Sequence, residues 1–333
     1  MINLTSPLAY EDRDDARHFY DKEDYYEWWY FDAQLENGYK CVVNFDHPAQ
    51  FVVNHPSTVQ IDIYTPEGEK YSELKEFDKG KCSASEDHCD VRMGANFVRQ
   101  ENDVYKMSVH IKGGFLQSER DIGADLAFKN KLPSWKPQGT GLLYAGKDGH
   151  IHGWIVAMPK ADVEGTLYFD GKSLPVRGNR GYHDHNWGTT NSYNHFSRWY
   201  WARLHDPKYT LIYGYVYPAK EADKIVSLLY LAKDGTPVLT TNRFELKEKK
   251  KETDRESGKS FATNLLINCR KKDVQVKCSV STKNVVEIAQ LPTNTNWPQY
   301  YFRFLAQYKA EIKMHGLVDN ICGETIHEHV ILR

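Results

Sequence analysis

The chain reads Glu27-Trp28-Trp29-Tyr30-Phe31-Asp32-Ala33-Gln34-Leu35, then Glu36-Asn37-Gly38, and continues with a second apolar run over residues 39–45. An Asn-Gly pair between two apolar runs is a strong signal for a β-hairpin. Aromatic and β-branched residues suit the pleated, half-buried surface of a strand. This stretch therefore predicts two antiparallel strands joined by a tight turn.

Similar strand-like segments follow at short intervals along the whole chain. They cover residues 60–64, 104–112, 142–144, 151–158, 165–169, 199–204, 209–217, 225–231, 244–268, 274–281 and 301–312, separated by Gly, Pro and Asp-Gly turn signals. No long helical period is visible, and the 22 tyrosines and 8 tryptophans also favour strands. Short strands at regular spacing predict barrels or sandwiches rather than a parallel α/β sheet.

A faint internal repeat indicates how the strands are divided. Residues 30–43 can be laid over residues 199–212, so that each half of the chain opens with the same aromatic hairpin. With 333 residues the chain is long enough for two cores. We therefore predict an all-β protein made of two tandem antiparallel β-barrels. The domains are expected at residues 1–190 and 191–333, and residues 1–20 are expected to be a loosely packed lead-in.

Composition excludes several classes of function. A formal charge of −2 argues against nucleic acid as a main partner, because phosphate binding needs excess Lys and Arg. No stretch approaches 18 apolar residues, so no transmembrane segment is predicted. The amino terminus lacks the pattern of an export signal. Six cysteines without a CxxC pair are expected to be free thiols, and the predicted location is cytoplasmic.

The first candidate site lies in the opening strand. Because side chains alternate along a strand, Glu27, Trp29 and Phe31 should share one face, and Trp28, Tyr30 and Asp32 the other. Either face places a carboxylate among aromatic rings. Such surroundings favour the protonated carboxyl group, which is useful to a general acid. The alternative is an outward carboxylate beside core aromatics.

The second candidate site is Gly178-Asn179-Arg180-Gly181-Tyr182-His183-Asp184-His185-Asn186-Trp187-Gly188. His183 and His185 should lie on one face of a strand and Asp184 on the other. A His-x-His pair can chelate a metal, but a third ligand is only a guess among His152 and Glu328, so we assign no metal site. The alternative is a structural motif whose polar groups bond to neighbouring backbone.

The third candidate segment is residues 198–203, followed by tyrosines at 209, 213, 215 and 217. Such stripes belong either to a core or to the wall of a ligand cavity with one wet end. Three weaker signals have ordinary explanations. Residues 323–329, which hold His327 and His329, are predicted to be a final polar-faced strand. Cys82, His88 and Cys89 form a weak zinc pattern, and residues 247–256 are a charge run typical of a solvated hairpin tip or short helix.

Residues 27–30 and 181–188, in this order and about 150 residues apart, resemble the carotenoid 1,2-hydratase (hydroxyneurosporene synthase) and AttH-like family. The resemblance extends over the whole chain, since that family pairs two lipocalin-like barrels. It implies an apolar ligand, an isoprenoid or polyene, in an aromatic cavity. Some similar proteins are hydratases, others catalyse cyclisation of the Diels-Alder type, and many have no assigned activity.

The residues suggest a hydratase that works by acid catalysis. Asp184 is the candidate acid, with Glu27 as the alternative, and His183 or His185 would orient the acid or deprotonate the incoming water. Aromatic faces would stabilise the carbocation. The predicted ligand-contacting residues are Trp28, Trp29, Tyr30, Asn186, Trp187, Trp199, Trp201 and Tyr215. No metal or organic cofactor is required.

Two other functions remain open at this point. A cofactor-free cyclase would only fold its substrate into a reactive shape, which predicts small effects of removing single carboxylates. A carrier would bind a hydrophobic molecule without changing it. The predicted partner in all three cases is a hydrophobic small molecule, with peripheral contact to a membrane as a further possibility.

Overall fold

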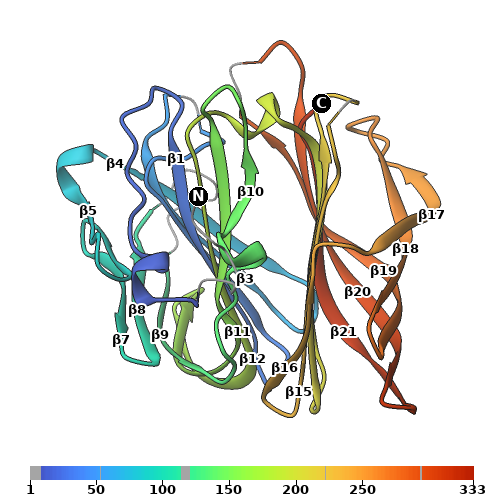
Figure 1. Ribbon diagram of the computed structural model, residues 1–333. Coiled ribbons are helices and arrows are strands. Elements are labelled where there is room, and N and C mark those ends of the chain that lie inside the picture. Colours follow the sequence, from blue (N-terminus) through green and yellow to red (C-terminus); the bar gives the residue numbers. More distant parts are fainter. Residues whose placement is uncertain (1–8, 53, 114–120, 222, 293–294) are drawn as a thin grey trace. The chain divides into compact units, whose positions relative to one another are not determined.

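The computed structural model describes residues 9–52, 54–113, 121–221, 223–292 and 295–333. Residues 1–7, where an export signal was sought, lie outside the described part. The chain divides into two compact units, Met1–Asn191 and Ser192–Arg333. The sequence predicted a boundary after residue 190. Each unit is built around one antiparallel sheet (Figure 1).

Unit 1 is a nearly closed barrel. Its main path runs β4-β3-β2-β1-β12-β11-β9-β8-β7-β6-β5, and β10 pairs with β11. The strands are β1 (Tyr26–Gln34), β2 (Lys40–Asp46), β3 (Ser57–Tyr64), β4 (Lys70–Phe77), β5 (Cys82–Ala84), β6 (Asp90–Met93), β7 (Asn96–Glu101), β8 (Val104–Ile111), β9 (Ile122–Asn130), β10 (Leu142–Ala145), β11 (Ile151–Phe169) and β12 (Lys172–Gly188). The short 3₁₀ turns are η1 (Asp12–Asp15), η2 (Lys79–Lys81) and η3 (Pro137–Gly139).

Unit 2 is a half-barrel. Its order is β16-β15-β14-β13-β21-β20-β19-β18-β17. After the turn η4 (Ser192–Asn194), the strands are β13 (Phe196–His205), β14 (Tyr209–Pro218), β15 (Val226–Lys233), β16 (Thr236–Thr241), β17 (Glu245–Thr253), β18 (Ser260–Lys271), β19 (Val274–Leu291), β20 (Gln299–Met314) and β21 (Leu317–Ile331).

The two units share one topological plan. Each opens with a hairpin, β1–β2 in unit 1 and β13–β14 in unit 2, and the first strand of each pairs with the last strand of the same unit. This is the aromatic hairpin that the internal repeat predicted. The predicted fold class, two tandem lipocalin-like barrels, is confirmed.

Alternation along the strands builds the core of each unit. In β1, Trp29, Phe31 and Ala33 point into the barrel core, where they meet β2, β3, β8 and β9 side chains. In unit 2, Tyr200 and Ala202 of β13 do the same. The opposite face of β1 and β12 is consequently free to carry polar groups, and this division organises the candidate site.

Some predicted elements have different bounds in the structure. Residues 151–158 and 165–169 belong to one strand, β11, whose register shifts near Pro159 allow a proline inside it. Residues 244–268 form two strands, β17 and β18. The charge run at 247–256 covers most of β17 and the turn after it. Lysines on this edge strand oppose edge-to-edge aggregation.

The expectation of a loose lead-in over residues 1–20 is wrong for the described residues near its end. Asp15 and Ala16 are buried, with 0% and 1% of their surface exposed. The reason is electrostatic: the Asp15 carboxylate pairs with histidines of β12, as described below.

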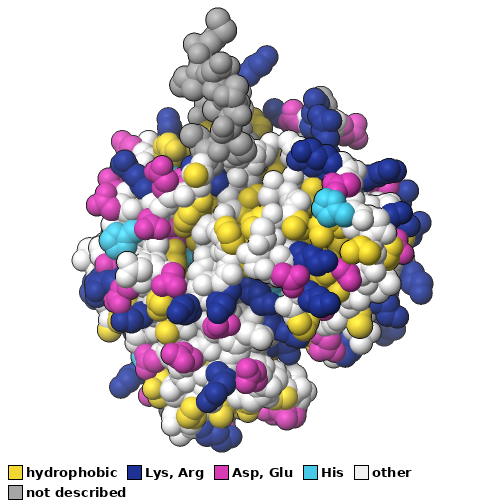
Figure 2. All heavy atoms as spheres, turned by 60° about the horizontal axis from the view of Figure 1, so that its bottom comes forward, with side chains coloured by type: hydrophobic (Ala, Val, Ile, Leu, Met, Phe, Trp, Pro, Cys, Tyr) yellow, Lys and Arg dark blue, Asp and Glu magenta, His cyan; other side chains and the backbone are white. Residues whose placement is uncertain are grey.

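The outer surface is charged and mixed. Figure 2 shows Lys and Arg side chains interspersed with Asp and Glu over one face. The six cysteines are free. Within the described residues, no helix is both long and apolar enough to cross a membrane.

Candidate functional site

The two sequence motifs lie side by side. Strands β1 and β12 are antiparallel neighbours, and their register pairs Glu27 with Trp187, Trp29 with His185 and Tyr30 with Asp184. Side chains alternate, so the motifs are divided between two faces. The inner face carries Glu27, Trp29, His183, His185 and Trp187. The outer face carries Trp28, Tyr30, Asp184 and Asn186.

On the inner face, five ionisable side chains form a buried ion-pair network: Asp15, His18, Glu27, His183 and His185. Its central contact joins Nε2 of His185 to Oε1 of Glu27 over 2.8 Å. Both residues are completely buried. The main-chain N–H of His18 also donates to Glu27, at 2.7 Å, and the hydroxyl of Tyr25 donates to its other oxygen. Hydrogen bonds from protein groups therefore replace the water that the buried carboxylate of Glu27 has lost.

These contacts separate the pKa values of the two partners. Burial raises the pKa of Glu27, but hydrogen bonds with His18 and His185 outweigh burial and lower it to about 2. Burial lowers the pKa of His185, but hydrogen bonds to Asp15 and Glu27 outweigh it and raise the pKa to about 9. At neutral pH the pair is thus a carboxylate and an imidazolium.

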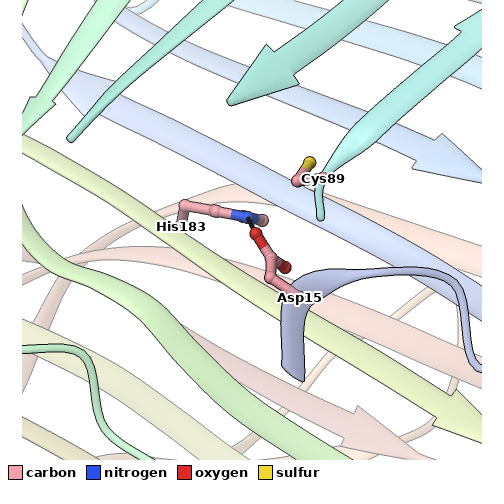
Figure 3. Close-up of side chains that lie close together, drawn as sticks. All are labelled: Asp15, Cys89 and His183. Carbon is pink, nitrogen blue, oxygen red and sulfur yellow. Dashed lines mark hydrogen bonds and ion pairs between the residues drawn. The ribbon is translucent and has the colours of Figure 1, made fainter. Parts of the chain in front are cut away.

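Asp15 extends the network from the N-terminal segment. Figure 3 shows its carboxylate facing the ring of His183, with Cys89 nearby. The distance from Asp15 Oδ2 to His183 Nε2 is 2.8 Å, and Tyr105 donates to the same oxygen at 2.8 Å. Burial raises the pKa of Asp15, but His183 and His185 outweigh burial and hold it well below its usual range.

The other nitrogen of His183 fixes the orientation of its ring. Nδ1 lies 2.9 Å from the main-chain oxygen of Tyr30, which can only accept, so Nδ1 carries a proton. The network therefore ties the N-terminal segment to β12 and β12 to β1.

Aromatic rings enclose the network. Trp29 stacks on His185 with ring centroids 4.4 Å apart, and its indole N–H donates to the main-chain oxygen of Asp15. Trp187 stacks on His18 at 3.8 Å. A Cβ at Gly153 would lie 2.1 Å from the Trp187 ring, so only glycine fits there. Trp29 and Trp187 therefore shield charges within unit 1.

Two groups on this face have the spacing of metal ligands: Asp15 with Cys89 and His183, and His18 with Glu27 and His185. The donor atoms within each group lie within 4.8 Å of one another. Asp15 and His183, and likewise Glu27 and His185, are already joined by 2.8 Å hydrogen bonds. The arrangement is that of an ion-pair network, and we assign no metal to it.

On the outer face, Asp184 is held by three donors. The indole N–H of Trp154 donates to Oδ2 at 2.9 Å, and the hydroxyl of Tyr182 donates to the same oxygen at 2.8 Å. The side-chain amide of Asn186 donates to Oδ1 at 3.0 Å. Only 5% of Asp184 is exposed. Its carboxyl group is thus fixed in position and largely removed from water.

Aromatic side chains surround Asp184 on this face. Tyr30 is its register partner on β1 and contacts the ring of Tyr182 edge-on at 6.3 Å. Trp154 meets Trp135 edge-on at 5.5 Å. Further along β1, Trp28 stacks with Tyr26 at 5.2 Å. A carboxyl group set among ring faces is an arrangement suited to proton transfer to an apolar molecule.

The structure therefore separates the predicted catalytic residues. Glu27, His183 and His185 come together on the inner face, while Asp184 lies on the outer face. Neither histidine is placed to orient Asp184; Trp154, Tyr182 and Asn186 do so. Of the predicted ligand-contacting residues, Trp28, Tyr30 and Asn186 share the face of Asp184.

The remaining predicted contacts belong to unit 2. Trp199 and Trp201 lie on one face of β13, and Tyr215 packs in the core on the other face beside its register partner Tyr200. The sequence predicted that these three residues contact one ligand together, whereas in unit 2 they lie on two opposite faces of the sheet.

Sequence reasoning missed Asp15, His18 and Trp154. Asp15 is 168 positions from His183, and nothing in a short polar segment signals such a contact. Trp154 lies on a strand that the sequence predicted. Only the alternation of side chains along that strand, which puts Trp154 on the face opposite to Gly153 and Ile155, could have indicated that its indole meets a polar group.

The fold, a nearly closed barrel and a half-barrel, is that of a lipocalin-like protein. Its unit 1 carries a candidate acid site, the Asp184 carboxyl group among aromatic rings. No family model matches the chain. A curated relative, the hydroxyneurosporene dehydrogenase of Chlorobaculum tepidum, is 29% identical over 231 residues, which are 61% of this chain and 59% of the relative. The match therefore spans less than two thirds of that protein.

Solved structures share the fold. CghA with Sch210972 superposes with a TM-score of 0.69 at 12% identity, covering 98% of this chain and 96% of that one. An AttH-like protein of Nitrosomonas europaea gives 0.65 at 13%, covering 98% of both chains. Kievitone hydratase of Nectria haematococca gives 0.64 at 13%, covering 98% and 93%. These relatives are consistent with the resemblance to the carotenoid hydratase and AttH-like family, and the solved structures show that the fold is shared.

Proposed function

We propose that this chain binds an apolar isoprenoid or polyene and hydrates one of its C=C bonds, with Asp184 as the general acid. The observation that supports this most directly is the outer-face arrangement, in which Trp154, Tyr182 and Asn186 hold the Asp184 carboxyl group beside Tyr30. The name of one similar structure, kievitone hydratase, supports the reaction class, and the name of the curated relative, hydroxyneurosporene dehydrogenase, supports an isoprenoid ligand.

The choice between the two candidate carboxyl groups rests on the ionised state of Glu27. A general acid must carry a proton when the substrate arrives. Glu27 does not, because its pKa is lowered to about 2 and its partner His185 holds the positive charge. Glu27, His183 and His185 are accordingly positioning residues, which hold β12 in place from the opposite face.

The reaction is balanced without a cofactor. Asp184 gives its proton to one carbon of the double bond, and the positive charge develops on the neighbouring tertiary carbon. Water adds to that carbon and loses a proton to the Asp184 carboxylate, which restores the acid. The ring faces of Tyr30 and Trp28 would stabilise the cation, each by about 2 kcal/mol when desolvated.

The hydrogen bonds to Asp184 serve the second half of this cycle. Trp154, Tyr182 and Asn186 are all donors, so they stabilise the carboxylate that forms when the proton leaves. Trp29 and Trp187 belong to the inner face and would act indirectly, by packing on the ion-pair network. Trp199, Trp201 and Tyr215 lie in unit 2 and have no assigned step in this mechanism.

The test is to incubate the purified protein with a lipid extract of its host and to identify by mass spectrometry what is retained and whether it changes. A retained isoprenoid that gains one water supports the hydratase, and Asp184→Asn should then retain the compound without adding water. Asp162→Asn, at a half-exposed position on β11, is the matched control.

The same experiment separates the alternatives. A compound of unchanged mass but altered chromatography would indicate a cyclase, and a compound identical to the input would indicate a carrier. Full hydration by Asp184→Asn would reject the acid that we propose. Cytoplasmic location and peripheral membrane contact remain predictions, which fractionation of the host would check.

A further inference from the structure

Strand β21 places two histidines on the inner side of unit 2. In the register, His327 lies between Ala202 of β13 and Phe304 of β20. His329 lies between Tyr200 of β13 and Phe302 of β20. Tyr200 and Ala202 belong to the core of this unit, so the histidine pair faces the core as well. Only 1% of His327 and 2% of His329 is exposed.

The pair is under-satisfied in its hydrogen bonds. Within the described ranges, Nε2 of His327 and both ring nitrogens of His329 are buried and have no hydrogen-bond partner. The hydroxyl of Tyr213, another fully buried core residue, also has none there. Buried polar groups in native proteins are nearly always paired, and an unpaired one reduces stability. Phenylalanine at positions 327 and 329 would fill the same space without that penalty.

The protonation of the pair follows from its surroundings. Burial lowers the pKa of His327 to about 4 and that of His329 well below its usual range, so both rings are neutral at pH 7. His327 Nδ1 lies 3.2 Å from the main-chain oxygen of Trp201 and must donate to it. Its Nε2 is consequently an acceptor. A neutral His329 offers one acceptor and one N–H donor.

Aromatic rings flank the histidine pair. Tyr200 stacks on His329 with centroids 4.1 Å apart, and Phe304 stacks on His327 at 5.2 Å. Phe302 lies 6.1 Å from His329, also stacked. The walls are therefore apolar and flat, while the atoms between them are polar.

A cluster of charged and polar side chains on β13, β14 and β17 adjoins the Tyr200 ring. Glu248 of β17 accepts from Arg198 at 3.0 Å and from Tyr217 at 3.1 Å. It also pairs with Lys251 at 2.8 Å, whose side chain is 59% exposed. Tyr217 of this cluster meets the ring of Tyr200 edge-on, with centroids 6.4 Å apart.

We infer that the pair His327 and His329 binds the hydroxyl group of an otherwise apolar ligand, an alcohol or a phenol. The hydroxyl would donate to Nε2 of His327 and accept from the N–H of His329, while the rings of Tyr200, Phe302 and Phe304 contact the apolar body. This inference uses residues of unit 2 alone and does not depend on the proposed hydratase activity.

The experiment compares two probes of nearly equal shape, p-cresol and p-xylene, by isothermal titration calorimetry on the full chain at pH 7. The two differ by a hydroxyl in place of a methyl. We expect p-cresol to bind at least tenfold more tightly. Equal affinities, or no binding of either probe, would overturn the inference and leave internal water as the partner of the histidines.

A variant tests the position of the site. His329→Phe should abolish the preference for p-cresol and raise the midpoint of thermal unfolding, because it replaces an unsatisfied buried group with an apolar ring. His315→Phe, at a 73% exposed position of the same unit, is the control and should leave the preference for p-cresol unchanged. A preference that persists in His329→Phe, or a lowered midpoint together with an unchanged preference, would contradict the inference.

Discussion

His185 and Glu27 form a 2.8 Å ion pair in the interior of unit 1, on the side of β12 opposite to Asp184. One strand thus separates two kinds of carboxyl group. Glu27 is held as a carboxylate by a charged partner, whereas Asp184 is held by neutral donors among aromatic rings. The first arrangement suits structure and the second suits proton transfer.

Glu27→Gln should destabilise unit 1 strongly. The substitution removes the charge of Glu27 and leaves the buried imidazolium with Asp15, at 3.4 Å, as its charged partner, and breaking a buried ion pair costs about 3–5 kcal/mol. Chemical denaturation followed by tryptophan fluorescence measures the free energy of unfolding. Glu86→Gln, at an exposed position in the same unit, should have almost no effect. Equal stability of the two variants would refute the importance of the pair.

The contribution of this pair should depend on pH with a defined sign. The pKa of His185 is raised from 6.5 to about 9, so its contribution is complete below pH 6.5 and is lost as pH rises through 9. The pKa of Glu27 is lowered from 4.5 to about 2, so its contribution is complete above pH 4.5 and is lost as pH falls through 2. Each shift corresponds to roughly 3 kcal/mol.

The measurement is the stability difference between the native chain and Glu27→Gln across pH. The difference should be largest between pH 4.5 and 6.5 and should shrink on both sides. A difference that keeps growing from pH 6.5 to 9 would mean that His185 is neutral in the folded protein.

Much of this arrangement follows from alternation along strands, and the rest from contacts that have no local signal. The two-residue period correctly placed Glu27 with Trp29, and His183 with His185, on shared faces. It also placed Asp184 on the opposite one. It did not say which face is buried, since that depends on how the sheet curls. The role of Asp15 was out of reach, because its partners are more than 160 residues away and follow from tertiary packing.

The final histidines illustrate the same limit. Residues 323–329 were correctly predicted to form part of a last strand, β21. The polar residues His327 and His329 nevertheless lie in the core of unit 2. Hydropathy favours a solvent-facing position for such residues, and only the pairing of β21 between β13 and β20 shows that they are covered.

Gly153→Ala should disturb Trp187 and, through it, His18. A Cβ at position 153 would lie 2.1 Å from the Trp187 ring, so the indole must move out of its stack. Overpacking of this kind typically costs about 1–3 kcal/mol. Thermal unfolding and the near-ultraviolet circular dichroism of tryptophan report the change. Gly80→Ala, where an added Cβ has no neighbour within 4 Å, is the control. A native spectrum for Gly153→Ala would show that the ring has room to shift.

Tyr182→Phe should slow hydration without weakening substrate binding. The hydroxyl of Tyr182 donates to Asp184 Oδ2 at 2.8 Å, and Trp154 remains as the second donor to that oxygen. The lost hydrogen bond acts on the carboxylate formed after proton transfer, so kcat should fall about 10- to 100-fold while KM changes little. Steady-state kinetics on a substrate identified from the lipid extract gives both constants. Tyr168→Phe, on β11 and outside this group, should leave both unchanged. A rise in KM at constant kcat would instead make Tyr182 a contact of the bound substrate, and would remove it from the proton-transfer step.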